Sequence, residues 1–161
     1  MIEMSEQQIQ ECDVNCPKLK WVFRLLVAAQ FVVAGLIFIL LQSTFTSWPT
    51  TLMAVFGLFI AVWSFAVMGR SINVSPELKQ SAQLKTTGPY RFVRHPMYLA
   101  LLMFCGGYVV ADGSMMGLAY WVGLLAILSM KIYYEERMLR NRFPVYNVYC
   151  ESTKRLIPFF Y

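Results

Sequence analysis

The residues best suited to chemistry gather in two polar segments, and each adjoins an apolar stretch. The first, residues 87–98, reads TGPYRFVRHPMY and holds the only histidine of the chain. Pro96 suits the first turn of a helix, where its missing N–H costs nothing. Arg94 and His95 would then lie at the positive end of that helix, which suits an anion such as a ligand carboxylate. The alternative is that they only anchor the helix at a membrane surface.

The second segment, residues 131–139, reads KIYYEERML and begins inside an apolar run. Two adjacent carboxylates, Glu135 and Glu136, are costly at the end of such a run if they face lipid. Lys131 and Glu135 are four residues apart, so on a helix they share a face and are spaced to form an ion pair. The alternative is a solvated helix end with local ion pairs.

Four apolar stretches must position these two segments, and we expect them to be membrane helices. Hydrophobic residues make up 58% of the 161 residues, against roughly 45–50% in an average soluble domain. Stretches 21–41 and 48–68 have the roughly 20 apolar residues that cross a hydrocarbon core of about 30 Å. A shorter stretch covers 97–111 and the last covers 114–134. The sequence Asp-Gly-Ser at 112–114 predicts a tight turn, so the last two stretches should form a helical hairpin.

All 14 basic residues precede the first stretch, lie at its start, separate the second from the third, or end and follow the fourth. Segments 42–47 and 112–114 contain none. Four crossings therefore place every basic residue on one side, which the positive-inside rule makes cytoplasmic. We expect an integral membrane protein with cytoplasmic termini, in the inner membrane if bacterial. Its net charge of +5 suits anionic headgroups, and no nucleic-acid partner is expected because the basic residues flank helices.

The four cysteines predict neither a disulfide framework nor a metal site. Cys12, Cys16, Cys105 and Cys150 are expected in the cytoplasm or the membrane, where thiols stay reduced. Cys12 and Cys16 also lack the second ligand pair of a zinc site.

The two segments occur in an order typical of a known family. Gly-Pro-Tyr, Arg-His-Pro-x-Tyr, a helical hairpin, Glu-Glu-x-x-Leu, a phenylalanine, two tyrosines and Ile-Pro follow one another over residues 72–158. This order resembles the isoprenylcysteine carboxyl methyltransferase family and the related phospholipid N-methyltransferases. The resemblance implies an all-α polytopic membrane enzyme with S-adenosylmethionine as cofactor. We expect a single membrane domain, 1–161, made of a cytoplasmic segment 1–20, two membrane helices at 21–69 and a catalytic part at 70–161.

The resemblance also implies roles for particular residues. Lys131 falls where the prenylcysteine enzymes place an arginine on the substrate carboxylate, although lysine cannot grip a carboxylate with two parallel bonds. We therefore expect Arg94 and Lys131 to be the catalytic residues. The expected cofactor-binding residues are Gln83, Leu84, Lys85, Tyr90, His95, Pro96, Met97, Tyr98, Glu135 and Glu136.

The chemistry of these residues agrees with that of the cofactor, which carries a sulfonium cation, an ammonium and a carboxylate. Glu135 and Glu136 suit the ammonium, and Arg94 and His95 suit the carboxylate. Aromatic faces suit the sulfonium cation, and the two segments supply four tyrosines, Tyr90, Tyr98, Tyr133 and Tyr134.

We therefore expect a membrane methyltransferase that acts on a lipid-linked carboxylate of the isoprenylcysteine type, with the substrate reaching the site from the bilayer. A phospholipid amine N-methyltransferase is the first alternative. A nicotinamide-dependent membrane reductase and a non-catalytic membrane scaffold are further alternatives, and cofactor binding separates all of them. The sequence leaves the acceptor atom and the oligomeric state open.

Overall fold

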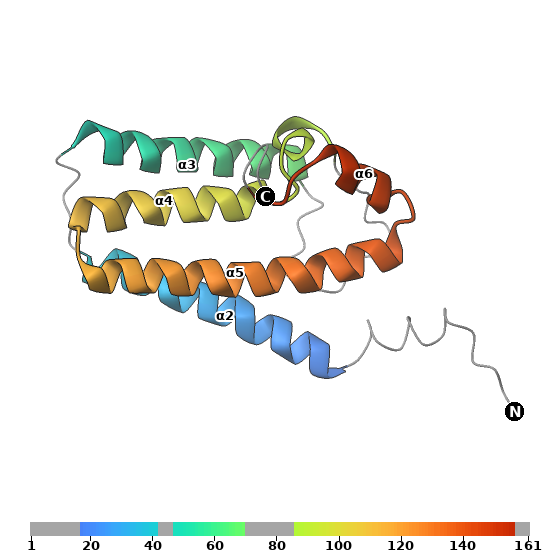
Figure 1. The fold of residues 1–161 in the computed structure, drawn as a ribbon, viewed down its shortest axis with the longest axis horizontal. Helices are drawn as coiled ribbons and strands as arrows, with labels where there is room; N and C mark the ends of the chain where they lie inside the picture. Colours follow the sequence, from blue (N-terminus) through green and yellow to red (C-terminus); the bar gives the residue numbers. More distant parts are fainter. Residues whose placement is uncertain (1–16, 42–46, 70–85, 157–161) are drawn as a thin grey trace, which may run out of the picture.

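A computed structural model describes residues 17–41, 47–69 and 86–156, which form an all-helical bundle (Figure 1). The described residues contain no strand, only an isolated parallel bridge between Val93 and Lys154. The expected fold class is confirmed. The helices are α2 (Pro17–Leu40), α3 (Trp48–Met68), the short 3-10 helix η2 (Gly88–Arg91), α4 (Pro96–Asp112), α5 (Met115–Arg142) and α6 (Tyr146–Ser152).

Three of these helices, α2, α3 and α5, are long and apolar enough to cross a membrane. The fourth apolar helix, α4, has 17 residues and is therefore about 26 Å long, slightly less than the roughly 30 Å hydrocarbon core. Large apolar side chains such as Phe56, Phe59 and Phe65 of α3 are exposed, which suits a surface that faces lipid. The structure is that of a polytopic membrane protein, with three candidate spanning helices and one shorter apolar helix.

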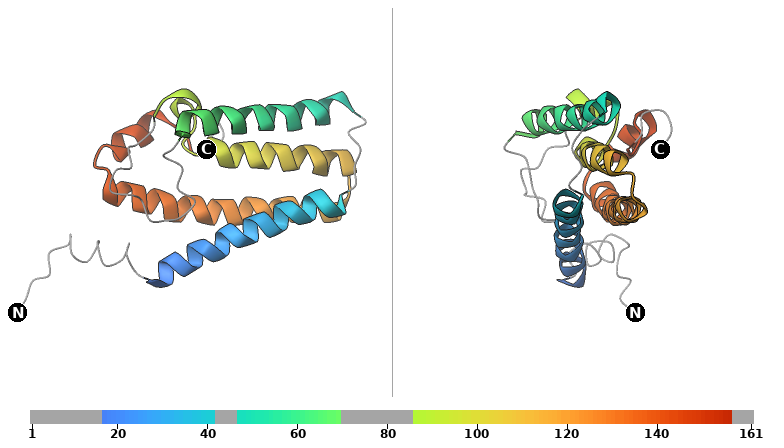
Figure 2. Two further views of the ribbon diagram at one scale, coloured as in Figure 1. Left: turned by 180° about the vertical axis from the view of Figure 1, so that it is seen from behind. Right: turned by 90° about the vertical axis from the view of Figure 1, so that its left-hand side faces the viewer.

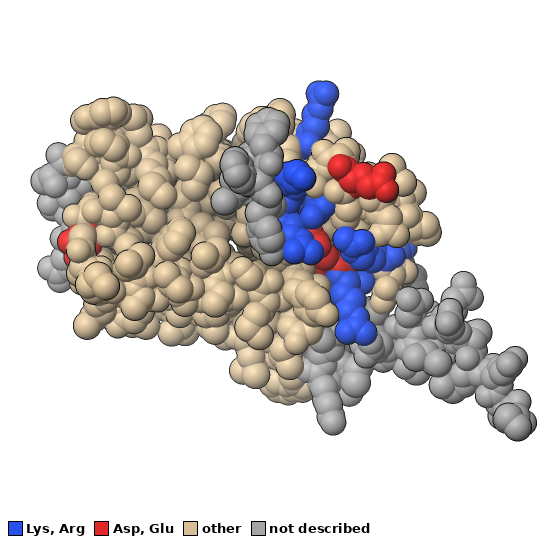
Figure 3. Space-filling view, in the orientation of Figure 1, with Lys and Arg blue, Asp and Glu red and all other residues tan. Residues whose placement is uncertain are grey.

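The four long helices lie roughly antiparallel to their chain neighbours. Helix α4 lies between α3 and α5, and α2 crosses α5 obliquely on its other side (Figures 1 and 2). The start of α4 and the ends of α3 and α5 therefore share one end of the bundle with the start of α2 and with α6. Lysine and arginine side chains gather at this end around carboxylates, and the visible face shows none at the other end (Figure 3).

Helices α3 and α4 pack with their backbones in contact. A Cβ atom on Gly57 would lie 2.8 Å from the Ala100 carbonyl oxygen and from the Phe104 nitrogen. A Cβ atom on Gly107 would lie 2.9 Å from the Thr50 carbonyl oxygen. Small residues at such contacts are typical of helices that associate within membranes. This contact fixes the position of α4 against α3, and with it the start of α4.

The turn between α4 and α5 is the one that the sequence predicts. Gly113 adopts a left-handed conformation with φ +67°, which glycine adopts without a steric penalty. The Ser114 hydroxyl accepts a hydrogen bond of 3.0 Å from the Gly117 N–H and caps α5. The Trp121 indole then donates to the Leu102 carbonyl at 2.9 Å, joining the two arms of the hairpin.

Candidate active site

The segment before α4 is held in an extended contact with the segment after α6. The backbone N–H of Arg94 donates to the Lys154 carbonyl at 2.7 Å, and that of His95 donates to the Arg155 carbonyl at 3.1 Å. His95 is the N-cap residue of α4 and Pro96 its first residue, as expected. The N–H groups of Arg94 and His95 are therefore engaged within the chain and do not donate to a ligand.

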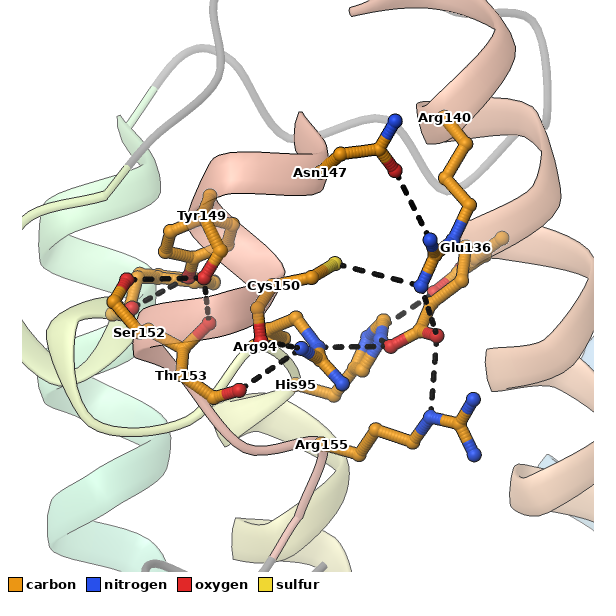
Figure 4. A network of polar contacts seen from close by, with 12 residues as sticks. Arg94, His95, Glu136, Arg140, Asn147, Tyr149, Cys150, Ser152, Thr153 and Arg155 are labelled. Atoms are coloured by element: carbon orange, nitrogen blue, oxygen red, sulfur yellow. Dashed lines mark hydrogen bonds and ion pairs between the residues drawn. The ribbon is translucent and has the colours of Figure 1, made fainter. Parts of the chain in front are cut away.

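Glu136 is the centre of a charged cluster formed with Arg94, His95, Arg140 and Arg155 (Figure 4). The residue is only 3% exposed. Oε1 lies 2.9 Å from Nε of Arg94, and Oε2 lies 3.1 Å from Nε of Arg155. Nε2 of His95 is 3.6 Å from Oε1, and Nη2 of Arg140 is 4.0 Å from Oε2. This Glu136 cluster joins α4, α5 and the segment after α6, and it surrounds the carboxylate with basic groups.

Arg94 also fastens the end of α6. Its Nη1 donates to the carbonyl oxygens of Cys150 and Thr153, both at 2.9 Å (Figure 4). With Nε beside Glu136, this guanidinium group contacts three different parts of the chain. A catalytic role for Arg94 stays a prediction, and the geometry favours a positioning role.

Glu135 lies on the other side of His95 and has a different environment. The Tyr98 hydroxyl donates to Oε1 of Glu135 at 2.5 Å, and Nδ1 of His95 lies 3.6 Å from Oε2. The rings of His95 and Tyr98 stack with centroids 5.5 Å apart and an angle of 7° between their planes. The Glu135 side chain is 24% exposed, so this carboxylate remains accessible beside two aromatic faces.

Lys131 lies one helical turn before Glu135 and is only 6% exposed. Its ammonium group donates to Oε1 of Gln30 on α2 at 3.0 Å. The same Nζ lies 4.8 Å from the ring centroid of Tyr98 and 5.4 Å from that of Phe23, which are cation–π distances. We call Lys131, Gln30, Phe23 and Tyr98 the Lys131 site.

One expectation for this part of α5 is wrong, and one alternative is only partly right. The described residues include no ion pair between Lys131 and Glu135, because the lysine reaches Gln30 and the glutamate accepts from Tyr98. The local ion pairs of the solvated helix end are present between Glu136 and Arg140, but Glu136 is buried and not solvated. Packing against α2, α4 and the segment after α6 covers this part of α5.

The other expected cofactor residues lie beside this group or outside the described residues. Pro96 is buried and Met97 half-buried in the first turn of α4. Tyr90 is buried in η2, and its carbonyl accepts a short hydrogen bond from the Tyr149 hydroxyl. Burial raises the pKa of Tyr149 to about 12, so this hydroxyl is protonated and can donate. The remaining three, Gln83, Leu84 and Lys85, lie outside the described residues.

Several residues of these two groups were not expected from the sequence. Gln30 could have been predicted from the sequence, because a polar residue inside a membrane helix generally has a functional role. Phe23 and Arg155 could not, since an apolar residue in an apolar helix and an arginine near a helix end are both ordinary. Only the packing of α2 on α5, and of the segment after α6 on α4, brings them to the site.

The fold and the site define a membrane-embedded helical protein with charged and aromatic groups gathered where α4 begins and α5 continues. A family model described as phospholipid methyltransferase matches residues 30–145. The chain therefore belongs to the phospholipid methyltransferase family, a family of membrane methyltransferases. The match begins at Gln30 and contains both Lys131 and Glu135. No curated protein and no solved structure matches the chain.

Proposed function

We propose that this protein is an S-adenosylmethionine-dependent methyltransferase whose acceptor is a lipid-linked carboxylate of the isoprenylcysteine type. The observation that carries the proposal is Tyr98, which contacts an accessible carboxylate with its hydroxyl and a buried ammonium with its ring. Glu135 and Lys131 thus bring opposite charges to one tyrosine, the first at its hydroxyl and the second over its ring. That arrangement suits a cationic cofactor and an anionic acceptor that must meet.

The residues on the cofactor side fit S-adenosylmethionine. Glu135 would hold its ammonium, and the His95 ring, which stacks on Tyr98, would offer an aromatic surface to the sulfonium cation. When bound, this cofactor supplies an electrophilic methyl group. Alignment of the two reactants and exclusion of water are the main contributions that the protein can make.

The acceptor side fits a carboxylate. The Lys131 ammonium would hold one carboxylate oxygen while the other forms the new bond to the methyl carbon, with a neutral thioether leaving. The product is a methyl ester, and no proton has to be removed. This chain therefore needs no general base for that reaction.

A phospholipid amine is the second candidate acceptor, and the description of the matching family favours it. An amine must lose a proton before or during methyl transfer, so a general base is needed. His95 and Glu135 are the candidates for that base. Lys131 would then lie near a cationic headgroup and would contact its phosphate.

The purified protein should be incubated with methyl-labelled S-adenosylmethionine and a panel of S-prenylated cysteine carboxylates, phosphatidylethanolamine and total lipid extracts. We expect label in a base-labile ester of the prenylated carboxylate. Label in an amine would replace the main proposal by the second. Calorimetric binding of a nicotinamide dinucleotide in place of S-adenosylmethionine would indicate a reductase, and binding of neither would favour a scaffold.

We also propose that the charged end of the bundle faces the cytoplasm, because all the basic residues of the sequence belong to that side and basic residues are retained there. Reporter fusions after Tyr161 and within segment 42–47 test this orientation. We expect a cytoplasmic signal from the first and an external signal from the second. A cytoplasmic signal from the second fusion would contradict the four-helix topology.

A further inference from the structure

We propose that Gln30 of α2 is a specificity-determining residue, which holds Lys131 as an uncompensated cation for the anionic group of the lipid acceptor. This inference rests on the proposed function and adds a helix to the site. The proposal concerns one hydrogen bond, from the Lys131 ammonium to Oε1 of Gln30 at 3.0 Å. Both residues are more than nine-tenths buried.

The groups in direct contact with Lys131 are all neutral, and its nearest carboxylate on α5, that of Glu135, is bonded to the Tyr98 hydroxyl. Gln30 offers an amide oxygen, and Phe23 and Tyr98 offer ring faces. An amide and two rings orient an ammonium group and stabilise its charge, but they do not cancel it. The part of the chain that the structure describes shows no carboxylate within ion-pair distance of Nζ. The buried positive charge is therefore available to a ligand.

Glu136, the other buried charged residue of α5, differs from Lys131 because it is paired with opposite charges. Glu136 has two guanidinium groups within 3.1 Å. A glutamate at position 30 would give Lys131 an equally close partner, because glutamate and glutamine have the same length and shape. An amide at this position orients the lysine without forming an ion pair with it.

The position of the lysine restricts what kind of ligand can use it. Lys131 lies on the membrane-spanning helix α5, one turn before Glu135, and α2 covers it from the side. A water-soluble anion would have to enter this apolar region alone, whereas a lipid carries its anionic group there on an apolar chain. The shared chemistry is an oxyanion attached to a lipid, either a carboxylate or the phosphodiester of a phospholipid.

The first test is thermal unfolding of the purified full chain in detergent with three probes. These are an S-prenylated N-acetylcysteine carboxylate, its methyl ester and a dialkyl phosphate. We expect the carboxylate, but not the ester, to raise the unfolding temperature of the wild type. A rise with the phosphate alone would identify a phospholipid as the source of the oxyanion. A protein that responds to neither anion, or equally to the ester, would overturn the proposal.

The second test is Gln30→Glu, which places a carboxylate beside the lysine. We expect the anionic probe to lose its effect on unfolding, and the acceptor KM to rise about tenfold or more as the internal ion pair competes with the substrate. The kcat and the calorimetric Kd for S-adenosylmethionine should change less than about twofold. In a Lys131→Met background, Gln30→Glu should raise KM no further, because the two residues act through one interaction.

An unchanged acceptor KM in Gln30→Glu, or an equal loss of cofactor affinity, would overturn the proposal. If that variant does not fold, Gln30→Leu tests the same proposal. Removal of the hydrogen bond should raise the acceptor KM several-fold at unchanged cofactor affinity. Failure of the proposed function is distinguishable. If the wild type binds the anionic probe but no S-adenosylmethionine, the proposed methyl transfer is wrong and the proposed anion site at Lys131 is retained.

Discussion

Two buried charged residues, Lys131 and Glu136, lie less than two helical turns apart on α5, and they differ in whether they are paired with an opposite charge. Glu136 is surrounded by Arg94, Arg155 and His95, and its cluster ties three parts of the chain together. Lys131 has an amide and two aromatic rings as partners, none of which carries an opposite charge. A buried charge that is fully paired generally maintains structure, whereas one that stays uncompensated in a membrane helix is a candidate for ligand binding.

The comparison also separates two adjacent glutamates. Glu135 and Glu136 differ by one position on α5, which turns their side chains about 100° apart. Glu136 points into the arginines, while Glu135 points toward Tyr98 and remains partly exposed. Mutations should therefore divide into those that unfold the protein and those that weaken one ligand.

The largest expected effect is that of Glu136→Gln on stability. The Arg94 side chain is 9% exposed, and removal of the charged partner of a buried ion costs about 3–5 kcal/mol. We expect a marked fall in the unfolding temperature in detergent. Glu135→Gln is the matched control and should cost about 1 kcal/mol, as for one hydrogen bond. Equal destabilisation by the two variants would contradict the division between them.

The next effect is that of Lys131→Met on the acceptor. Loss of a charged hydrogen bond to the substrate costs about 1.5–3 kcal/mol, which raises the acceptor KM roughly 10- to 150-fold. Stability should be unchanged or higher, since a buried cation without an ion pair is removed. Lys131→Arg keeps the charge and serves as the control. A joint loss of cofactor affinity would show that the lysine acts through Glu135 instead.

Glu135→Gln tests the cofactor side of the same comparison. If the carboxylate binds the ammonium of S-adenosylmethionine, its loss should weaken binding by about 1.5–3 kcal/mol. Calorimetry in detergent measures this directly. Tyr98→Phe keeps the ring but removes the hydroxyl that orients Glu135, and should weaken binding by only about 0.5–1.5 kcal/mol. Unchanged affinity in Glu135→Gln would remove this residue from the cofactor site.

The smallest expected effect is that of pH on the wild-type reaction. A carboxylate acceptor is ionised above about pH 5, so the rate should show little acceptor-linked change from there to alkaline pH. An amine acceptor becomes reactive only when it deprotonates, so its rate would rise steeply with pH. The profile is measured on the best substrate of the panel. A steep rise, together with an active Lys131→Met, would move the protein to the phospholipid amine side of the family.

Local signals in the sequence predicted much of the fold. Pro96 and Gly113 mark a helix start and a turn because proline restricts the backbone and glycine releases it wherever they occur. The apolar stretches predicted the long helices to within a few residues at most ends. The exception is α5, which continues eight residues past Tyr134 as a polar helix. Its Glu136 is paired there with Arg94 and Arg155, which lie outside the helix.

The site was predictable in its parts and not in its pairings. Lys131 and Glu135 have the spacing of an ion pair, and only tertiary packing supplies the partners that they contact instead. Gln30 is 101 positions from Lys131, and Arg155 is 19 from Glu136. No pattern within one helix contains that information. Most residues of the site could therefore be predicted from the sequence, but not which of them form hydrogen bonds or ion pairs with one another.

The backbone contact between α3 and α4 has a mechanical consequence for the site. Gly57 and Gly107 let the two backbones touch at two levels, so neither helix can slide or turn without driving backbone into backbone. The two helices therefore pack as one unit, and His95 and Tyr98 lie at the end of this unit where α4 begins. A change in the spacing between α4 and α5 thus stretches the bond from Tyr98 to Glu135 and leaves the ring stack intact. The α3–α4 pair therefore sets the position of His95 and Tyr98, to which α5 brings Glu135 and Lys131.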